Sequence, residues 1–322
     1  MQAELEHRVA TARERLDEVR REVARVYIGS SSPTDHMLVA LLARGHVLLD
    51  GVPGVAKTTL AKAFAEALGV TVRRIQFTPD LLPADITGTY VLSPRDGTFS
   101  FRRGPIFANL VLADEINRAP PKTQAALLEA MQEQQVTVEG DGFALPAPFI
   151  VVATQNPIDL EGTYPLPEAQ IDRFLIHLAM GYPKREHEIA MLRAHQATPV
   201  AAAAVLDEKT VATMQAVVQE IHVEDDLYDY AVGLTDHTRS DQRVLLGASP
   251  RATLGLIQAA KSLAVMRGRT FVTPDDLREL AIPVLAHRLI LRDDVTGDHA
   301  IREDVVRTAL GRISYRKAVR PV

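Results

Sequence analysis

One stretch near the start of the chain, residues 47–59, constrains the fold more than any other. It reads VLLDGVPGVAKTT, in which three apolar residues typical of a buried parallel strand precede a glycine- and proline-containing loop. A lysine and two threonines then open a helical pattern, residues 60–68. The order strand, glycine loop, Lys-Thr, helix is that of a phosphate-binding loop. We therefore expect a phosphate-binding βα unit here, and the structural alternative is an ordinary glycine-rich βα turn.

The residues of this loop have different expected roles. Glycines allow the tight turn, and the N–H groups and partial positive charge of the helix N-terminus favour an anion. Lys57 would reach the β- and γ-phosphates, and Thr58 would ligate Mg²⁺. The strict motif has glycine at the position of Ala56; we expect alanine to adopt the helical conformation of a helix start there and to contact phosphate through its N–H. The expected binding loop consists of Gly51, Val52, Pro53, Gly54, Val55, Ala56, Lys57, Thr58 and Thr59.

Composition limits the function classes. The chain has 322 residues, enough for two domains, and no cysteine, so thiol catalysis and disulfides are excluded. Its beginning does not read as a signal peptide, and no apolar run reaches the roughly 18 residues of a membrane helix, so we predict a cytoplasmic protein. A net charge of −5 and 5% aromatic residues argue against a dedicated nucleic-acid binder. The ten histidines show no metal-ligand spacing, so no transition metal is predicted.

A second motif, NLVLADE at residues 109–115, strengthens the interpretation of the first. An apolar strand here delivers two acids at its carboxyl end, where α/β sheets place ligands. Asp114 is expected to hold Mg²⁺, and Glu115 to polarise the attacking water as general base. One acid at such a position is commonly a cap, but two acids after a Lys-Thr loop indicate nucleotide hydrolysis.

Two later positions complete the candidate site. Residues 149–156, FIVVATQN, form another apolar strand with a polar end, and Asn156 would sit beside the water and the γ-phosphate. Without the earlier motifs, Asn156 would be better interpreted as a cap before a proline. Residues 166–174, LPEAQIDRF, begin a helix, in which Arg173 taken alone is a solvated or ion-paired arginine.

The remaining segments frame this core. Residues 2–27 have the spacing of an amphipathic helix, after which Tyr27 and Ile28 either contact an adenine or belong to a plain helix cap. Two hairpins are expected, at about 89–101 and at 135–147 with a turn at 140–142. The chain after residue 183 has helical spacing, and Arg251 lies in the first turn of one helix, an unfavourable place for a cation without a nearby anion. We therefore predict a first domain over residues 1–183 and an all-helical one over residues 184–322.

Taken together, these motifs resemble those of AAA+ ATPases, and more narrowly those of the MoxR family. The resemblance covers most of residues 45–183 and extends to the ASPR sequence at 248–251. Ala56 fits this family although it breaks the general motif. The segments that carry the resemblance are GHVLLDGVPGVAKT (45–58), LPADITG (82–88), RGPIF (103–107), DEINRAPP (114–121), ATQNP (153–157) and LPEAQIDRF (166–174).

The resemblance implies a P-loop fold with a five-stranded parallel sheet flanked by helices and a smaller all-α lid domain. It implies ATP and Mg²⁺ as cofactors and a homo-oligomeric ring, usually a hexamer, with ATP between subunits. By this analogy Asn156 is the first sensor, Arg251 the second, and Arg173 the arginine finger that reaches a neighbour's γ-phosphate. The two hairpins match elements that face a pore or a partner.

Members of this family are chaperone-like, and they often work with partners that carry a von Willebrand factor A domain. The predicted function is therefore ATP-driven remodelling or maturation of a protein client. The alternatives are a nucleic-acid-remodelling motor, a chelatase-like motor of the same clade, and a nucleotide-gated scaffold with very slow turnover. The acidic net charge disfavours the first, and the intact set of Glu115, Asn156 and Arg173 disfavours the scaffold.

Overall fold

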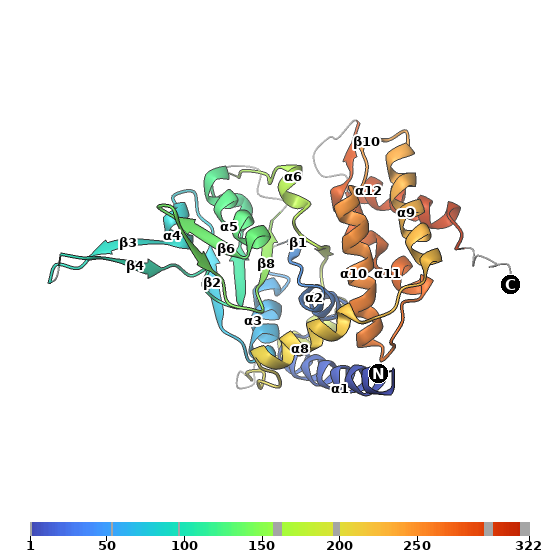
Figure 1. The fold of residues 1–322 in the computed structure, drawn as a ribbon, viewed down its shortest axis with the longest axis horizontal. Helices are drawn as coiled ribbons and strands as arrows, with labels where there is room; N and C mark the ends of the chain where they lie inside the picture. Colours follow the sequence, from blue (N-terminus) through green and yellow to red (C-terminus); the bar gives the residue numbers. More distant parts are fainter. Residues whose placement is uncertain are drawn as a thin grey trace.

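The structure, a computed structural model, describes residues 2–52, 54–95, 97–156, 163–195, 200–292 and 299–315. An α/β core and a mainly helical region lie next to each other (Figure 1). The central sheet of the core has five parallel strands, as predicted. Their spatial order is β2 (Val72–Gln76), β5 (Leu110–Asp114), β8 (Ile150–Gln155), β1 (Val47–Gly51) and β9 (Ile176–Met180).

Both faces of this sheet are covered, which is why β1 and β5 read as continuous apolar runs ending in polar residues. Alternate side chains of β1 enter different hydrophobic clusters. Val47 and Leu49 pack with α3 (Lys57–Leu68), whereas Leu48 packs with α5 (Pro121–Glu133) on the other face. Since all five strands are parallel, their carboxyl ends, which carry the candidate residues, meet at one edge of the sheet.

The N-terminal helices lie on the first of these faces. Helix α1 (Gln2–Val26) is amphipathic as predicted, with Val9, Leu16 and Val23 buried at seven-residue intervals. It packs against both α3 and α10 (Pro250–Met266), and so runs along the core and the helical region together (Figure 1). The shorter α2 (Ser32–Leu42) leads into β1.

Two antiparallel hairpins are inserted in the core, as the sequence predicts. The first, β3 (Gly88–Leu92) with β4 (Phe99–Arg103), follows the short α4 (Pro83–Thr87) and projects away from the sheet (Figure 1). The second is β6 (Gln135–Val138) with β7 (Asp141–Ala144). Its turn lies one residue earlier than predicted, at Glu139 and Gly140, which both have positive φ, 51° and 95°. The rings of Phe101 and Phe143 stack 4.0 Å apart and join the two hairpins.

The region after β9 is mainly helical, as expected, with a short antiparallel ribbon added. Gln215 of this region donates a hydrogen bond of 2.7 Å to the Leu41 carbonyl of α2, so it is packed directly against the core. The helices are α7 (Arg185–His195), α8 (Glu208–Gln219), α9 (Asp225–Ser240), α10, α11 (Pro274–Leu285) and α12 (His299–Arg312), and the ribbon is β10 (Val244–Leu246) with β11 (Ile290–Leu291). Short helices are α6 (Glu168–Ile171), η1 (Ile116–Arg118) and η2 (Ala286–Arg288).

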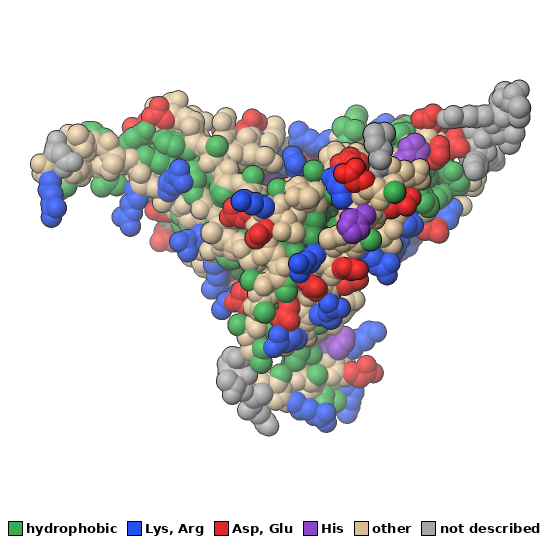
Figure 2. Space-filling model, turned by 60° about the horizontal axis from the view of Figure 1, so that its bottom comes forward, with side chains coloured by type: hydrophobic (Ala, Val, Ile, Leu, Met, Phe, Trp, Pro, Cys, Tyr) green, Lys and Arg blue, Asp and Glu red, His purple; other side chains and the backbone are tan. Residues whose placement is uncertain are grey.

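Two surface properties bear on function. Among the helices that the structure describes, none is long and apolar enough to cross a membrane. On the face drawn in Figure 2, acidic and basic side chains are interspersed, and no broad area of one sign is visible.

Candidate nucleotide site

The phosphate-binding loop connects β1 to α3 as predicted, but the conformation of one residue differs from the expectation. Ala56, which caps α3, has φ 61° and ψ 28°, the left-handed region, rather than the helical conformation. This backbone geometry explains why the general motif has glycine here, because a Cβ atom makes it costly by about 1–2 kcal/mol. Gly54 also has positive φ, 84°. Pro53 lies outside the described residues.

Lys57 joins the ends of two strands. Its ammonium donates hydrogen bonds to the carbonyl of Gly51 at 2.5 Å and to the carbonyl of Gln155 at 2.9 Å. Burial lowers the pKa of this ammonium, and nearby carboxylates oppose that shift. The charge of Lys57 is thus held beside the loop, between the ends of β1 and β8.

Asp114 lies at the centre of a polar network on the adjacent strand end. Its carboxylate accepts hydrogen bonds from the hydroxyls of Thr58 at 3.2 Å and of Thr154 at 2.5 Å. Arg74 of β2 adds an ion pair at 2.7 Å. Thr58 and Asp114, the two expected Mg²⁺ ligands, are therefore neighbours. A hydroxyl and a carboxylate are hard oxygen donors of the kind Mg²⁺ prefers, so the residues present fit this ion.

Glu115 is fixed in an unusual backbone conformation. Its φ is 58°, again left-handed, and its backbone N–H donates to the Thr154 hydroxyl at 3.0 Å. Its carboxylate accepts a hydrogen bond from Gln76 at 2.8 Å and lies 3.3 Å from Nε of Arg118. A non-glycine residue held in this region at a strand end is typical of functional sites.

Asn156 follows β8 directly and is buried. Its backbone carbonyl accepts a hydrogen bond of 3.3 Å from the side chain of Asn117. Since the preceding residue, Gln155, binds Lys57, the structure places Asn156 at the same edge of the sheet as Lys57 and Asp114.

The two predicted arginines belong to the junction between the core and the helical region. Arg173 is partly buried between Asp172 and Phe174. Nε of the buried Arg288, from the helical region, lies 2.8 Å from the Asp172 carboxylate, and its Nη2 donates to the Phe174 carbonyl at 2.8 Å. Arg251 is exposed in the first turn of α10. Burial lowers the pKa of Arg288, and the Asp172 carboxylate opposes that shift. The positive charge of Arg251 lowers this pKa further.

A pocket of about 310 Å³ adjoins the phosphate-binding loop. Tyr27 and Ile28 line it together with Val55 and Ala56. Residues 178–184, which are the end of β9 and the segment that follows it, form another wall that no sequence motif indicated. Tyr27 is half-buried among largely apolar residues, and such surroundings suit a flat ring such as a nucleobase.

Sequence reasoning missed three polar residues of this site: Arg74, Gln76 and Thr154. The first two lie on β2, next to β5 in the sheet, and no motif marks them. A signal existed for Thr154, because the register places Ala153 opposite Ala113 and therefore Thr154 beside Asp114. That register is known only once the sheet order is known.

The fold and this site define an AAA-type nucleotide-binding protein. Residues 46–176 match the family model described as "ATPase family associated with various cellular activities (AAA)", and residues 236–308 match that of the AAA lid domain. The chain is 46% identical over 302 residues to Chaperone MoxR1 of Mycobacterium tuberculosis, covering 91% of this chain and 80% of that protein.

Two further comparisons agree. Protein MoxR of Methylorubrum extorquens is 33% identical over 298 residues, covering 84% of this chain and 86% of its own length. A crystal structure of a candidate ATPase from Cytophaga hutchinsonii superposes with a TM-score of 0.88 at 35% identity, covering 98% of this chain and 99% of that one. The chain belongs to the MoxR family of AAA ATPases, which confirms the resemblance found in the sequence.

Proposed function

We propose that this protein hydrolyses ATP at sites formed between adjacent copies of an oligomeric ring, and uses the cycle to remodel or mature other proteins. The observation that carries the proposal is the network at the carboxyl edge of the sheet. There, Lys57 joins the ends of β1 and β8, and Thr58 lies within hydrogen-bond distance of Asp114.

The residues of this network have complementary roles in the proposal. Lys57 and the N–H groups of residues 51–59 bind and orient the phosphates, while Thr58 and Asp114 hold Mg²⁺. When bound, Mg²⁺ neutralises charge that develops on the phosphate oxygens. Glu115 accepts the proton of the attacking water, and Asn156 orients that water. Tyr27 and Ile28 contact the base in the adjoining pocket.

The arginines extend the site beyond one copy of the chain. Arg173 reaches the γ-phosphate held by the neighbouring copy, and Arg251 responds to nucleotide from the first turn of α10. The junction formed by Asp172, Phe174 and Arg288 supports this role, since it couples the backbone around Arg173 to the helical region. We propose six copies in the ring, a division of each copy at residue 183, and a cytoplasmic location.

The name of Chaperone MoxR1 supports a chaperone-like function. In the proposal the client is a protein, and a partner with a von Willebrand factor A domain presents it. The mixed charges in Figure 2 agree with a protein partner better than with a nucleic-acid track, which favours a concentrated basic surface.

Phosphate release by the purified protein tests the proposal. We expect Glu115→Gln to bind ATP and to hydrolyse it about 10²–10⁴-fold more slowly, because the general base is lost. Lys57→Ala, which removes a binding contact, is the matched control and should lose ATP binding as well. If the unmodified chain releases no more phosphate than Lys57→Ala does, the proposal fails.

Two further measurements separate the protein-remodelling motor from its alternatives. Duplex DNA should leave the ATPase rate unchanged at low and at high salt, whereas a nucleic-acid motor would show salt-sensitive stimulation. The Glu115→Gln variant with bound ATP should retain a protein carrying a von Willebrand factor A domain, and Lys57→Ala should not. Equal retention by both variants would reject a nucleotide-dependent partner.

A further inference from the structure

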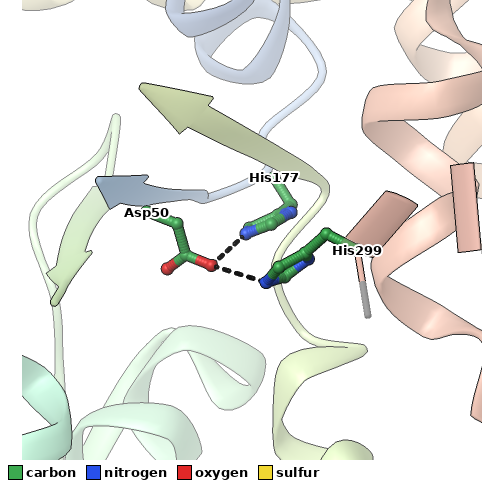
Figure 3. Close-up of side chains that lie close together, drawn as sticks. All are labelled: Asp50, His177 and His299. Carbon is green, nitrogen blue, oxygen red and sulfur yellow. Dashed lines mark hydrogen bonds and ion pairs between the residues drawn. The ribbon is translucent and has the colours of Figure 1, made fainter. Parts of the chain in front are cut away.

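Three side chains far apart in the sequence converge beside the phosphate-binding loop. Asp50 is the penultimate residue of β1, His177 lies on β9, and His299 begins α12 of the helical region (Figure 3). Nε2 of His177 is 2.7 Å and Nε2 of His299 is 3.5 Å from the same oxygen, Oδ2 of Asp50. One ligand atom from each of the three lies within 4.8 Å of the others.

The sheet geometry explains the first two positions. Leu48 is opposite His177 in the parallel register, and Asp50 is two residues further along the strand, so both polar side chains project from the same face. Helix α12 supplies the third, and its imidazole stacks on that of His177 with centroids 5.1 Å apart and planes 21° apart. Both rings therefore present Nε2 to one carboxylate.

We infer that Asp50, His177 and His299 form a binding site for a divalent transition-metal ion of the Zn²⁺ class. Two imidazoles and a carboxylate are ligands that Zn²⁺ takes in three-residue sites, with an open position for water. Imidazole nitrogen selects such ions over the Mg²⁺ of a nucleotide site. Nothing in this inference depends on ATP hydrolysis.

The distances agree with this assignment. Ligand atoms at about 2.0–2.1 Å from a tetrahedral ion lie about 3.3 Å from one another. The observed separations of 2.7 Å and 3.5 Å from Asp50 lie on either side of that value, so small side-chain rotations would create the site. A purely hydrogen-bonded arrangement explains less, since 3.5 Å is too long for a good bond from His299.

The protonation states also suit a metal. Burial tends to raise the pKa of Asp50, but its interactions with His177, His299 and Gln155 together outweigh that effect, and the pKa is lowered. Burial and the charge of His177 lower the pKa of His299. Both shifts favour the forms that bind a metal ion, the carboxylate of Asp50 and the neutral imidazole of His299. The charge of Arg302 lowers the pKa of His299 and the charge of Glu303 raises it, so the charges around this imidazole are of both signs.

The proposed metal site is accessible to solvent on one side and lies next to the phosphate-binding loop. The His299 side chain is 40% exposed, whereas those of Asp50 and His177 are each 9% exposed, so an ion can enter from the α12 side. Asp50 directly precedes Gly51, whose carbonyl binds Lys57. A bound ion would therefore tie the helical region to the core next to the phosphate-binding loop.

The test uses the full chain, stripped with a chelator and kept in excess Mg²⁺ without nucleotide. We expect calorimetric titration with Zn²⁺ to show one bound ion per protomer. We expect Co²⁺ bound to the same imidazole and carboxylate ligands to give visible d–d absorption bands. His299→Ala and Asp50→Asn should each weaken the binding of both ions by at least about tenfold. His299 is partly exposed at the start of its helix, so its replacement leaves the core packing intact.

The matched control is His222→Ala. His222 also lies beside a carboxylate, 3.4 Å from Glu224, but both side chains are exposed and outside the cluster. This variant should bind Zn²⁺ and Co²⁺ like the unmodified chain. The inference is overturned if no stoichiometric ion binds, if His299→Ala keeps full affinity, or if His222→Ala loses as much affinity as His299→Ala.

Discussion

Replacing Thr154 with valine removes one hydroxyl from the buried junction between β5 and β8 and keeps the shape of the side chain. That hydroxyl donates to Asp114 at 2.5 Å and accepts from the backbone N–H of Glu115 at 3.0 Å. A hydrogen bond to a charged group contributes about 1.5–3 kcal/mol, and an unsatisfied buried donor costs about 1–3 kcal/mol. Since Thr58 and Arg74 still pair with Asp114, we expect Thr154→Val to lose about 3 kcal/mol of stability.

The control is Thr154→Ser, which keeps the hydroxyl and removes only a methyl group, at a cost of about 1 kcal/mol. Urea unfolding without nucleotide measures both, and far-UV circular dichroism is the suitable signal because the chain has no tryptophan. Thr154→Val should also slow ATP hydrolysis, since Glu115 loses the contact that fixes its left-handed backbone. The reasoning is refuted if Thr154→Val stays within about 0.5 kcal/mol of the unmodified chain, or if serine costs as much as valine.

Three further predictions concern single residues. Arg173→Ala should lower turnover about 10³–10⁵-fold with an unchanged Kd for ATP, and near-normal turnover would remove Arg173 from the finger role. Burial lowers the pKa of His46 from 6.5 to about 4. As the pH drops below 6.5, the unfolded chain therefore binds a proton at His46 before the folded chain does, and the stability of the fold decreases. Between pH 7 and pH 5, the unmodified chain should lose about 2 kcal/mol more stability than His46→Asn, and equal losses would contradict this. Ala56→Gly should raise the free energy of unfolding by about 1 kcal/mol, because glycine tolerates the left-handed φ of 61°; a decrease would contradict that explanation.

Sequence reasoning could predict the fold because its signals are local and repeated along the chain. Three core strands, β1, β5 and β8, are apolar runs that end in polar residues, and parallel pairing brings those ends together without further information. The motif at 109–115 therefore predicted that Asp114 would lie near the phosphate-binding loop, and the structure places it 3.2 Å from the Thr58 hydroxyl.

What could not be predicted depends on backbone angles and on long-range contacts. Ala56 looked compatible with a helix start because sequence does not report φ, and the turn at Glu139 was misplaced by one residue for the same reason. The cluster of Asp50, His177 and His299 combines two strands with a distant helix. A search for short metal-ligand spacings therefore misses it.

The most direct test of the central claim is to mix two inactive variants, Glu115→Gln and Arg173→Ala. If Arg173 acts on the site of a neighbouring copy, an equal mixture contains interfaces with an intact Glu115 on one side and an intact Arg173 on the other. About one quarter of the unmodified ATPase rate should then return, as random assembly predicts for a head-to-tail ring. If both residues serve the site of their own copy, every site keeps one defect, and the mixture will hydrolyse no more ATP than the separate variants.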